Sequence, residues 1–326
     1  MRRTRPLLRG LLAASLLAAG LALPVGAQDA PVGTEIPFVD AEGITRGTIM
    51  VKDVADPFTE FDPSYPAEQG SRYVGMTVVF TASDEETFEA NASGFVLRDA
   101  IGRLSYPAWV PRPADAKIPD AQSQTLAPGN RISGFLGFSI PEDVAVDEIL
   151  YLPDYEHVLV IADLRPEPGN PVGTPYTYTR EDGAIADVNA VLADPFTGYA
   201  DGYDPEEGMR WVGAAYGFEN TGETPFPAWP SEIYLRDASG RIYSAGYLSR
   251  PEGYVLADAE SQVLSPGDRI TGFLAYSVPA DAQIVAIDYA TAGTRRVTIG
   301  DLRAEGGPTP GTDEPAAPEA SPGTSQ

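Results

Sequence analysis

Hydrophobic residues alternate with polar or small residues over many short stretches of this chain. One such stretch has its apolar side chains at every second position: Val74, Met76, Val78 and Phe80. Side chains two residues apart lie on the same face of a β-strand, so this pattern predicts strands. The spacing of an amphipathic helix is not sustained anywhere in the chain. We therefore expect an all-β protein.

The chain contains the same segments twice, 138 residues apart. Ala-Asp-Pro-Phe-Thr at 55–59 recurs at 193–197, and Leu-Arg-Asp-Ala at 97–100 recurs at 235–238. More than a third of the positions from 54 to 165 are identical to their counterparts without a gap. Chance similarity does not hold one register over this length. The sequence therefore indicates a tandem duplication in which each unit has the size of one domain.

Composition sets the limits of the two units, which we place at residues 36–165 and 176–303. Residues 166–175 between them are rich in proline and glycine, which is typical of a short extended linker. Residues 304–326 contain no large apolar side chain and predict a disordered tail rich in Pro, Gly and Ala. Residues 28–35 are expected to form a loose N-terminal arm.

Turn signals divide each unit into about seven short strands. Asp99 and Gly102 bracket a predicted type I turn between two strands, with Asp99 as its cap, and Pro128-Gly129 marks another turn. Seven short strands separated by turns favour a β-sandwich, with a small barrel as the alternative.

The order of the motifs carries a resemblance to a known family. An Asp-Pro-Phe strand end precedes Arg-aromatic-Val-Gly, a Leu-x-Asp-x-x-Gly hairpin, and Pro-Gly before Gly-Phe-Leu-x-Phe/Tyr-Ser. Both units resemble the telokin-like immunoglobulin-fold domain of secreted bacterial proteins of unknown function, a group that includes the mycobacterial immunoprotective extracellular antigens. Asn220-Thr221-Gly222 keeps that family's Asn-Thr-Gly turn, whereas Ala82-Ser83-Asp84 departs from it. The resemblance implies two tandem immunoglobulin-like β-sandwich domains and no catalytic residues.

The first 27 residues have the features of a secretory signal peptide. Four arginines precede an apolar run from Leu11 to Leu23, and Val25-Gly26-Ala27 fits a cleavage site. The alternative, an uncleaved membrane anchor, needs roughly 20 apolar residues, and this run is shorter. We expect a mature protein without a transmembrane segment that is secreted or held at the cell envelope.

Charge and composition exclude several classes of function. The 326 residues include 47 acidic and 22 basic side chains, giving a net charge of −25. This balance argues against nucleic-acid binding, which needs clustered Lys and Arg. The absence of Cys excludes disulfides and thiolate sites, and the single His excludes multi-His metal sites. We expect no cofactor, no enzymatic activity and a monomer.

Two polar features are candidates for functional sites. The lone His157 is not repeated in the second unit, where Arg295 takes its position, and we interpret it as a surface residue. The only metal candidate is a weak Ca²⁺ site in one acidic segment, with a solvated loop as the preferred interpretation. Its residues are Asp201, Asp204, Glu206 and Glu207.

The chain is rich in aromatic residues, with 16 Tyr, 12 Phe and 3 Trp. Tyr and Trp combine an apolar body with a polar tip and can bind sugar rings or protein partners when exposed. A possible ligand platform in the second unit consists of Trp211, Trp229, Tyr203 and Tyr247. Trp211 corresponds to Tyr73, so a shared structural aromatic is the alternative at that position.

These features together favour a secreted, non-enzymatic binding or protein-interaction protein. Its partner would be a protein or glycan outside the cell. The alternatives are a carbohydrate-binding module that uses the aromatics of the second unit, and an acidic structural spacer of the cell envelope. A hydrolase is disfavoured, because no pair of carboxylates or nucleophile-base pair stands out.

Overall fold

The computed structural model describes residues 30–40, 42–154, 156–165, 169–251, 254, 256, 258, 260–291 and 295–303. The predicted signal peptide, the predicted tail and the first part of the linker lie outside these residues. The described chain is nearly all β, with antiparallel strands and two single-turn 3-10 helices, at Ala92–Gly94 and Pro230–Glu232. Within it, no helix is long and apolar enough to cross a membrane.

The first half of the chain forms two four-stranded antiparallel sheets. The outer sheet has the order β1-β2-β3-β8, with strands Ile36–Val39, Thr45–Ala55, Ser71–Ala82 and Arg131–Pro141. The inner sheet has the order β10-β9-β5-β6, with strands Leu159–Asp163, Val146–Tyr151, Phe95–Asp99 and Leu104–Ser105. A short pair, β4 (Phe88–Ala90) and β7 (Gln124–Leu126), completes this half.

The second half repeats this arrangement. Its outer sheet, β11-β12-β13-β18, consists of Tyr176–Thr179, Ile185–Ala193, Met209–Glu219 and Arg269–Pro279. Its inner sheet, β16-β15-β19-β20, consists of Ile242–Ser244, Ile233–Asp237, Ile284–Thr291 and Arg295–Asp301. The short pair is β14 (Phe226–Ala228) and β17 (Gln262–Leu264). Residues 138 positions apart also pair alike: Phe80 lies opposite Ile132, and Phe218 opposite Ile270.

Each half has its own hydrophobic core between its two sheets, which fits a β-sandwich. Phe80 from the outer sheet packs edge-on against Tyr151 from the inner sheet, with ring centroids 5.9 Å apart. The corresponding pair, Phe218 and Tyr289, has its centroids 5.4 Å apart. The alternation noted in β3 therefore supplies one wall of the first core.

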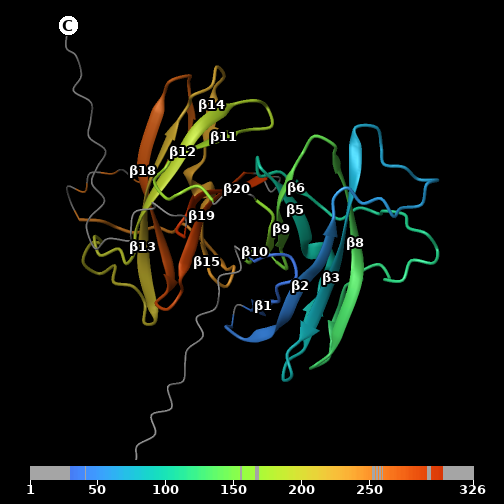
Figure 1. Cartoon of the computed structure of the whole chain (residues 1–326). Helices are drawn as coiled ribbons and strands as arrows, with labels where there is room; N and C mark the ends of the chain where they lie inside the picture. Colours follow the sequence, from blue (N-terminus) through green and yellow to red (C-terminus); the bar gives the residue numbers. More distant parts are fainter. Residues whose placement is uncertain are drawn as a thin grey trace, which may run out of the picture.

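The two halves meet through their inner sheets, so that four layers of strands follow one another (Figure 1). The amide of Arg296 donates to the carbonyl of Gly102, at 2.9 Å, and the amide of Val158 donates to the carbonyl of Gly240, at 2.7 Å. These bonds are related by the same offset of 138, because 102 + 138 = 240 and 158 + 138 = 296. The contact is therefore reciprocal, like the interface of a two-fold symmetric dimer.

The interface between the halves contains buried ion pairs. Arg98 on β5 contacts Glu148 on β9, and Arg236 on β15 contacts Asp288 on β19. All four side chains are buried. Because the inner sheets are covered on both faces, residues that alternate outward from each core face the other half instead of solvent.

Two sequence interpretations change with this arrangement. His157 is buried, not on the surface: its Nδ1 lies 2.9 Å from Asp154, and its backbone forms a bridge with Arg241 of the second half. The described part of the N-terminal arm is not loose, because Ala30 packs into the first core and its carbonyl accepts from the amide of Asp163. Likewise, Val172 of the linker packs into the second core.

Candidate functional site

A small hydrophobic cluster covers the outer face of each outer sheet, away from the domain core. In the first half it consists of Phe58, Val110 and Phe135, with Phe61, Tyr73 and Ile118 packed around them. In the second half the residues exactly 138 positions later gather in the same way: Phe196, Leu248 and Phe273, with Tyr199, Trp211 and Leu256.

A glycine lets the two phenylalanines of each cluster approach the strand backbone closely. A Cβ at Gly75 would lie 2.7 Å from Phe58 and 2.8 Å from Phe135. Gly213 has the same close contacts with Phe196 and Phe273. The Val-Gly of the repeated Arg-aromatic-Val-Gly motif is therefore explained by packing on both sides of the strand.

An arginine fixes the segment that carries each cluster. Arg72 Nε donates to Asp56 at 2.6 Å, and Arg210 Nε donates to Asp194 at 2.7 Å. Both guanidinium groups also donate to the carbonyl of the proline that ends the neighbouring strand. The hydrogen bonds that Arg210 donates to the Asp194 carboxylate raise the pKa of Arg210 above its ordinary value. The first residues of the loop that begins at the Asp-Pro-Phe motif are thus fixed by these hydrogen bonds.

In each half this loop and a second loop, which follows β6 or β16, together present an exposed pair of aromatic rings. Tyr65 and Trp109 are 52% and 72% exposed, and their ring centroids lie 5.6 Å apart at an interplanar angle of 74°. Tyr203 and Tyr247 are 37% and 73% exposed, with centroids 6.1 Å apart at 68°. The second pair follows the first at the offset of 138. We call these four residues the aromatic pairs.

A half-buried aromatic residue supports each pair from below. The Trp211 indole Nε1 donates to the carbonyl of Tyr203 at 2.9 Å. In the first half the Tyr73 hydroxyl donates to the carbonyl of Tyr65 at 3.4 Å. The loop position of one exposed ring is therefore set in the same way in both halves.

The structure brings together three of the four residues of the predicted platform. Tyr203 and Tyr247 form an aromatic pair, and Trp211 supports it from a half-buried position. Trp229 lies elsewhere, where β14 leads into the 3-10 helix, with the Arg180 guanidinium 5.0 Å from its ring centre. Sequence reasoning missed the pair in the first half, although the offset maps Tyr203 onto Tyr65 and Tyr247 onto Trp109.

The acidic residues of the weak Ca²⁺ candidate are all exposed: Asp201, Asp204, Glu206 and Glu207. Among the described residues, no group of three or more acidic or His side chains is placed to hold a metal ion. The segment instead carries Tyr203 of the second aromatic pair.

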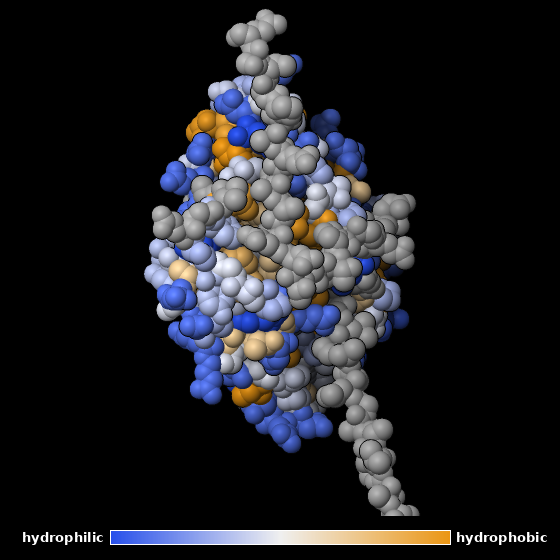
Figure 2. Space-filling view, turned by 90° about the vertical axis from the view of Figure 1, so that its left-hand side faces the viewer, coloured by the Kyte–Doolittle hydropathy of each residue, from blue (hydrophilic) through white to orange (hydrophobic). Residues whose placement is uncertain are grey.

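The aromatic pairs lie on opposite sides of the molecule. The loops of the first half protrude on the right of Figure 1, and the corresponding loops of the second half lie on the left. Figure 2 shows that left-hand side, where hydrophilic residues dominate and hydrophobic residues form small separate patches. The arrangement offers two similar aromatic surfaces that face away from each other.

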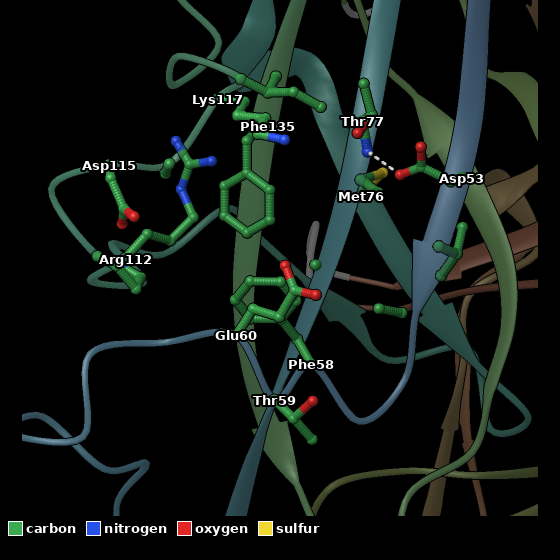
Figure 3. Close-up of a pocket in the computed structure, with 16 residues that line it drawn as sticks. Asp53, Phe58, Thr59, Glu60, Met76, Thr77, Arg112, Asp115, Lys117 and Phe135 are labelled. Atoms are coloured by element: carbon green, nitrogen blue, oxygen red, sulfur yellow. Dashed lines mark hydrogen bonds between the residues drawn. The ribbon is translucent and has the colours of Figure 1, made fainter.

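A cavity of about 640 Å³ opens beside the cluster of the first half (Figure 3). Phe58, Phe135 and Gly75 line it, together with charged side chains of both signs: Asp53, Glu60, Arg112, Asp115 and Lys117. Asp53 is tied to β3, because its carboxylate accepts from the amide of Thr77 at 3.2 Å.

Comparison with known proteins gives little for this chain. No family model matches it, and no curated protein matches it. A solved structure, the YjhA protein from Bacillus subtilis, is 18% identical over 42% of this chain and 85% of that chain, with a TM-score of 0.28.

Proposed function

We propose that this protein is a secreted, non-enzymatic interaction protein that binds partners through the two aromatic pairs. It would consist of two immunoglobulin-like β-sandwich domains of the telokin-like kind, as the motif order implies. The signal-like N-terminus supports a place outside the cytoplasm, secreted or at the cell envelope.

The observation that carries this proposal is the repetition of an exposed aromatic pair at equivalent positions. Trp109 and Tyr247 are each more than 70% exposed, although burying a large aromatic side chain in a core would stabilise the fold. Exposed apolar groups that gather on one surface mark interaction sites in soluble proteins. An acidic spacer would need no such residues.

The geometry of the pairs favours a protein partner over a glycan. The rings are nearly perpendicular, at 74° and 68°, so a sugar ring can stack on only one ring of each pair. An apolar side chain of a protein can instead fill the corner between the two rings. Aromatic residues of this kind often supply most of the binding energy at protein interfaces.

Two similar surfaces on opposite sides suit a protein that links two partners. Because the halves are joined by a reciprocal interface, the two surfaces keep a fixed orientation. One chain could then bridge two partners that approach from opposite sides, whereas two partners on one flat surface could not both be bound.

Affinity capture with matched variants tests this proposal. Residues 28–326 are immobilised and incubated with secreted and envelope proteins, and separately with soluble polysaccharides. The W109A/Y247A double variant removes one ring from each pair. V263A is the control, because Val263 is 69% exposed but lies on β17, outside both clusters.

We expect specific proteins to be retained by the wild type and by V263A and to be lost with the double variant. Retention that does not depend on Trp109 and Tyr247 would refute the proposal. Retention of polysaccharides alone, with the same dependence, would favour the carbohydrate-binding alternative instead.

A further inference from the structure

The cavity of the first half has a counterpart in the second half that a tyrosine fills. Residues 116 and 254 correspond at the offset of 138, and they are alanine and tyrosine. The Tyr254 ring lies edge-on to Phe196 and Phe273, with centroids 6.2 Å and 5.5 Å away. The Arg250 guanidinium lies 4.6 Å from the centre of the same ring.

The surroundings of Tyr254 are reproduced around the cavity. Phe58 and Phe135 pack with centroids 5.0 Å apart at 44°, and Phe196 and Phe273 with centroids 4.8 Å apart at 45°. The Arg112 guanidinium lies 4.1 Å from the Phe135 ring centre, as Arg250 lies 4.6 Å from Phe273. Both arginines are held by an acid eight residues later, at 2.5 Å.

The backbone also directs the two side chains alike. The amide of Ala116 donates to the carbonyl of Pro113 at 3.0 Å, and the amide of Tyr254 donates to that of Pro251 at 3.2 Å. Ala116 itself lines the cavity. The space that the Tyr254 ring occupies in the second half is therefore open in the first half.

The open cavity carries polar groups that suit a phenol. A Cβ at Gly198 would lie 3.6 Å from Tyr254 Cε2, the ring atom beside the carbon that bears the hydroxyl. The corresponding residue in the first half is Glu60, whose carboxylate overlaps the Phe58 ring and lies below the Phe135 ring in the view of Figure 3. It can accept a hydrogen bond from a hydroxyl at that end of the ring.

We propose that this cavity binds a tyrosine side chain of a partner polypeptide, in the way that the second half holds Tyr254. The ring lies on Phe58 and Phe135 under the Arg112 guanidinium, and the hydroxyl donates to Glu60. A cation above an aromatic ring adds to the contact with the apolar floor. The site does not depend on the aromatic pairs, because neither Tyr65 nor Trp109 lines the cavity.

Saturation-transfer NMR with N-acetyltyrosinamide on residues 28–326 tests the site. For a single ring of this size we expect a dissociation constant on the order of 1 mM. A116Y places a tyrosine in the cavity and should weaken binding about tenfold or more. A114Y is the matched control, since Ala114 is exposed and does not line the cavity.

Further variants distinguish loss of binding at the cavity from loss through misfolding, and from binding at the aromatic pairs of the proposed function. Y254A opens the second cavity and should increase the transferred signal, a gain that misfolding does not produce. W109A/Y247A should bind the probe as the wild type does. E60Q should reduce the preference for the tyrosine probe over N-acetylphenylalaninamide.

Equal binding by the wild type and A116Y would overturn the proposal. An equal loss with A114Y would overturn it as well, because the effect would then not belong to the cavity. Loss of the probe with W109A/Y247A would show that the exposed pairs bind it instead, which also contradicts the cavity site.

Discussion

Replacing Asp288 by alanine tests the buried charges that join the two halves. Asp288 is fully buried and accepts from Arg236 Nε at 2.9 Å and from the Thr298 hydroxyl at 2.9 Å. Burial alone would raise the pKa of Asp288, but the adjacent Arg236 guanidinium outweighs it and holds that pKa far below the ordinary value. D288A leaves the guanidinium buried without this partner.

The expected cost follows from that uncompensated charge. Removing one partner of a buried ion pair destabilises a protein by about 3–5 kcal/mol, whereas replacing both with apolar residues is often near neutral. Urea unfolding should therefore show a loss of about 3–5 kcal/mol for D288A. The R236M/D288L double variant should recover only part of it, because Arg296, whose Nη1 lies 3.5 Å from Asp288, still loses its contact.

The pH dependence of the free energy of unfolding tests separately whether the charged form of Asp288 stabilises the folded state. A carboxyl group whose pKa is lowered by folding stabilises the folded state above its unfolded pKa, near 3.8, and this contribution is lost as the pH falls through the folded pKa. The difference in the free energy of unfolding between the wild type and D288N should therefore become smaller below about pH 4. A D288A variant within about 0.5 kcal/mol of the wild type would refute the reasoning.

Three further predictions concern single side chains. Burial raises the pKa of Tyr151 to about 12, so its contribution to stability is complete below about pH 10 and is lost as the pH rises toward 12; Y151F should reduce the fall of the urea midpoint across that range without abolishing it, because burial also raises the pKa of Tyr216 to about 12. W109A should change the free energy of unfolding by less than about 0.5 kcal/mol, whereas W211A should cost more than about 1 kcal/mol, because only Trp211 is packed into a cluster; equal effects in denaturant titrations would contradict the assignment of exposed and supporting rings. Gly102 has a φ of 77°, and a Cβ there would lie 2.3 Å from Val297 of the other half; G102A should therefore lower the melting temperature more than G43A, where nothing lies within 4 Å and φ is also positive, and equal shifts would argue against the tight interface.

Local features of the fold could be predicted where a side chain forms hydrogen bonds with backbone groups a few residues away. Asp99 caps its turn as expected, because its Oδ1 accepts from the amides of Ile101 and Arg103. The alternating pattern of β3 also predicted its strand, since Val74, Met76, Val78 and Phe80 all lie in the first core. These signals lie within a few residues of each other along the chain.

The interface between the halves could not be predicted in this way. Charged residues are rarely buried, so Arg98 and Asp288 do not mark a core in the sequence. The comparison of the two halves does not reveal the arginine–acid pair either, because the acids are not at equivalent positions. The acid is Glu148 in the first half and Asp288, equivalent to Leu150, in the second. Both positions lie on the same face of the strand, two residues apart, so either can reach the arginine.

The candidate site was predicted only for one half. Composition drew attention to Tyr203 and Tyr247, but exposure depends on which loops cover the outer sheet, and sequence alone does not give that. Trp211 is half-buried and Trp109 is exposed, although both are tryptophans followed directly by a valine. Only the offset of 138, applied to residues already known to be exposed, identifies Tyr65 and Trp109.

The most direct test of the proposed function is the number of partner molecules that one chain binds. Isothermal titration of a captured partner into residues 28–326 should give two equivalent sites. W109A and Y247A should each leave one site, and the double variant should leave none. A single site that neither substitution affects would contradict the account.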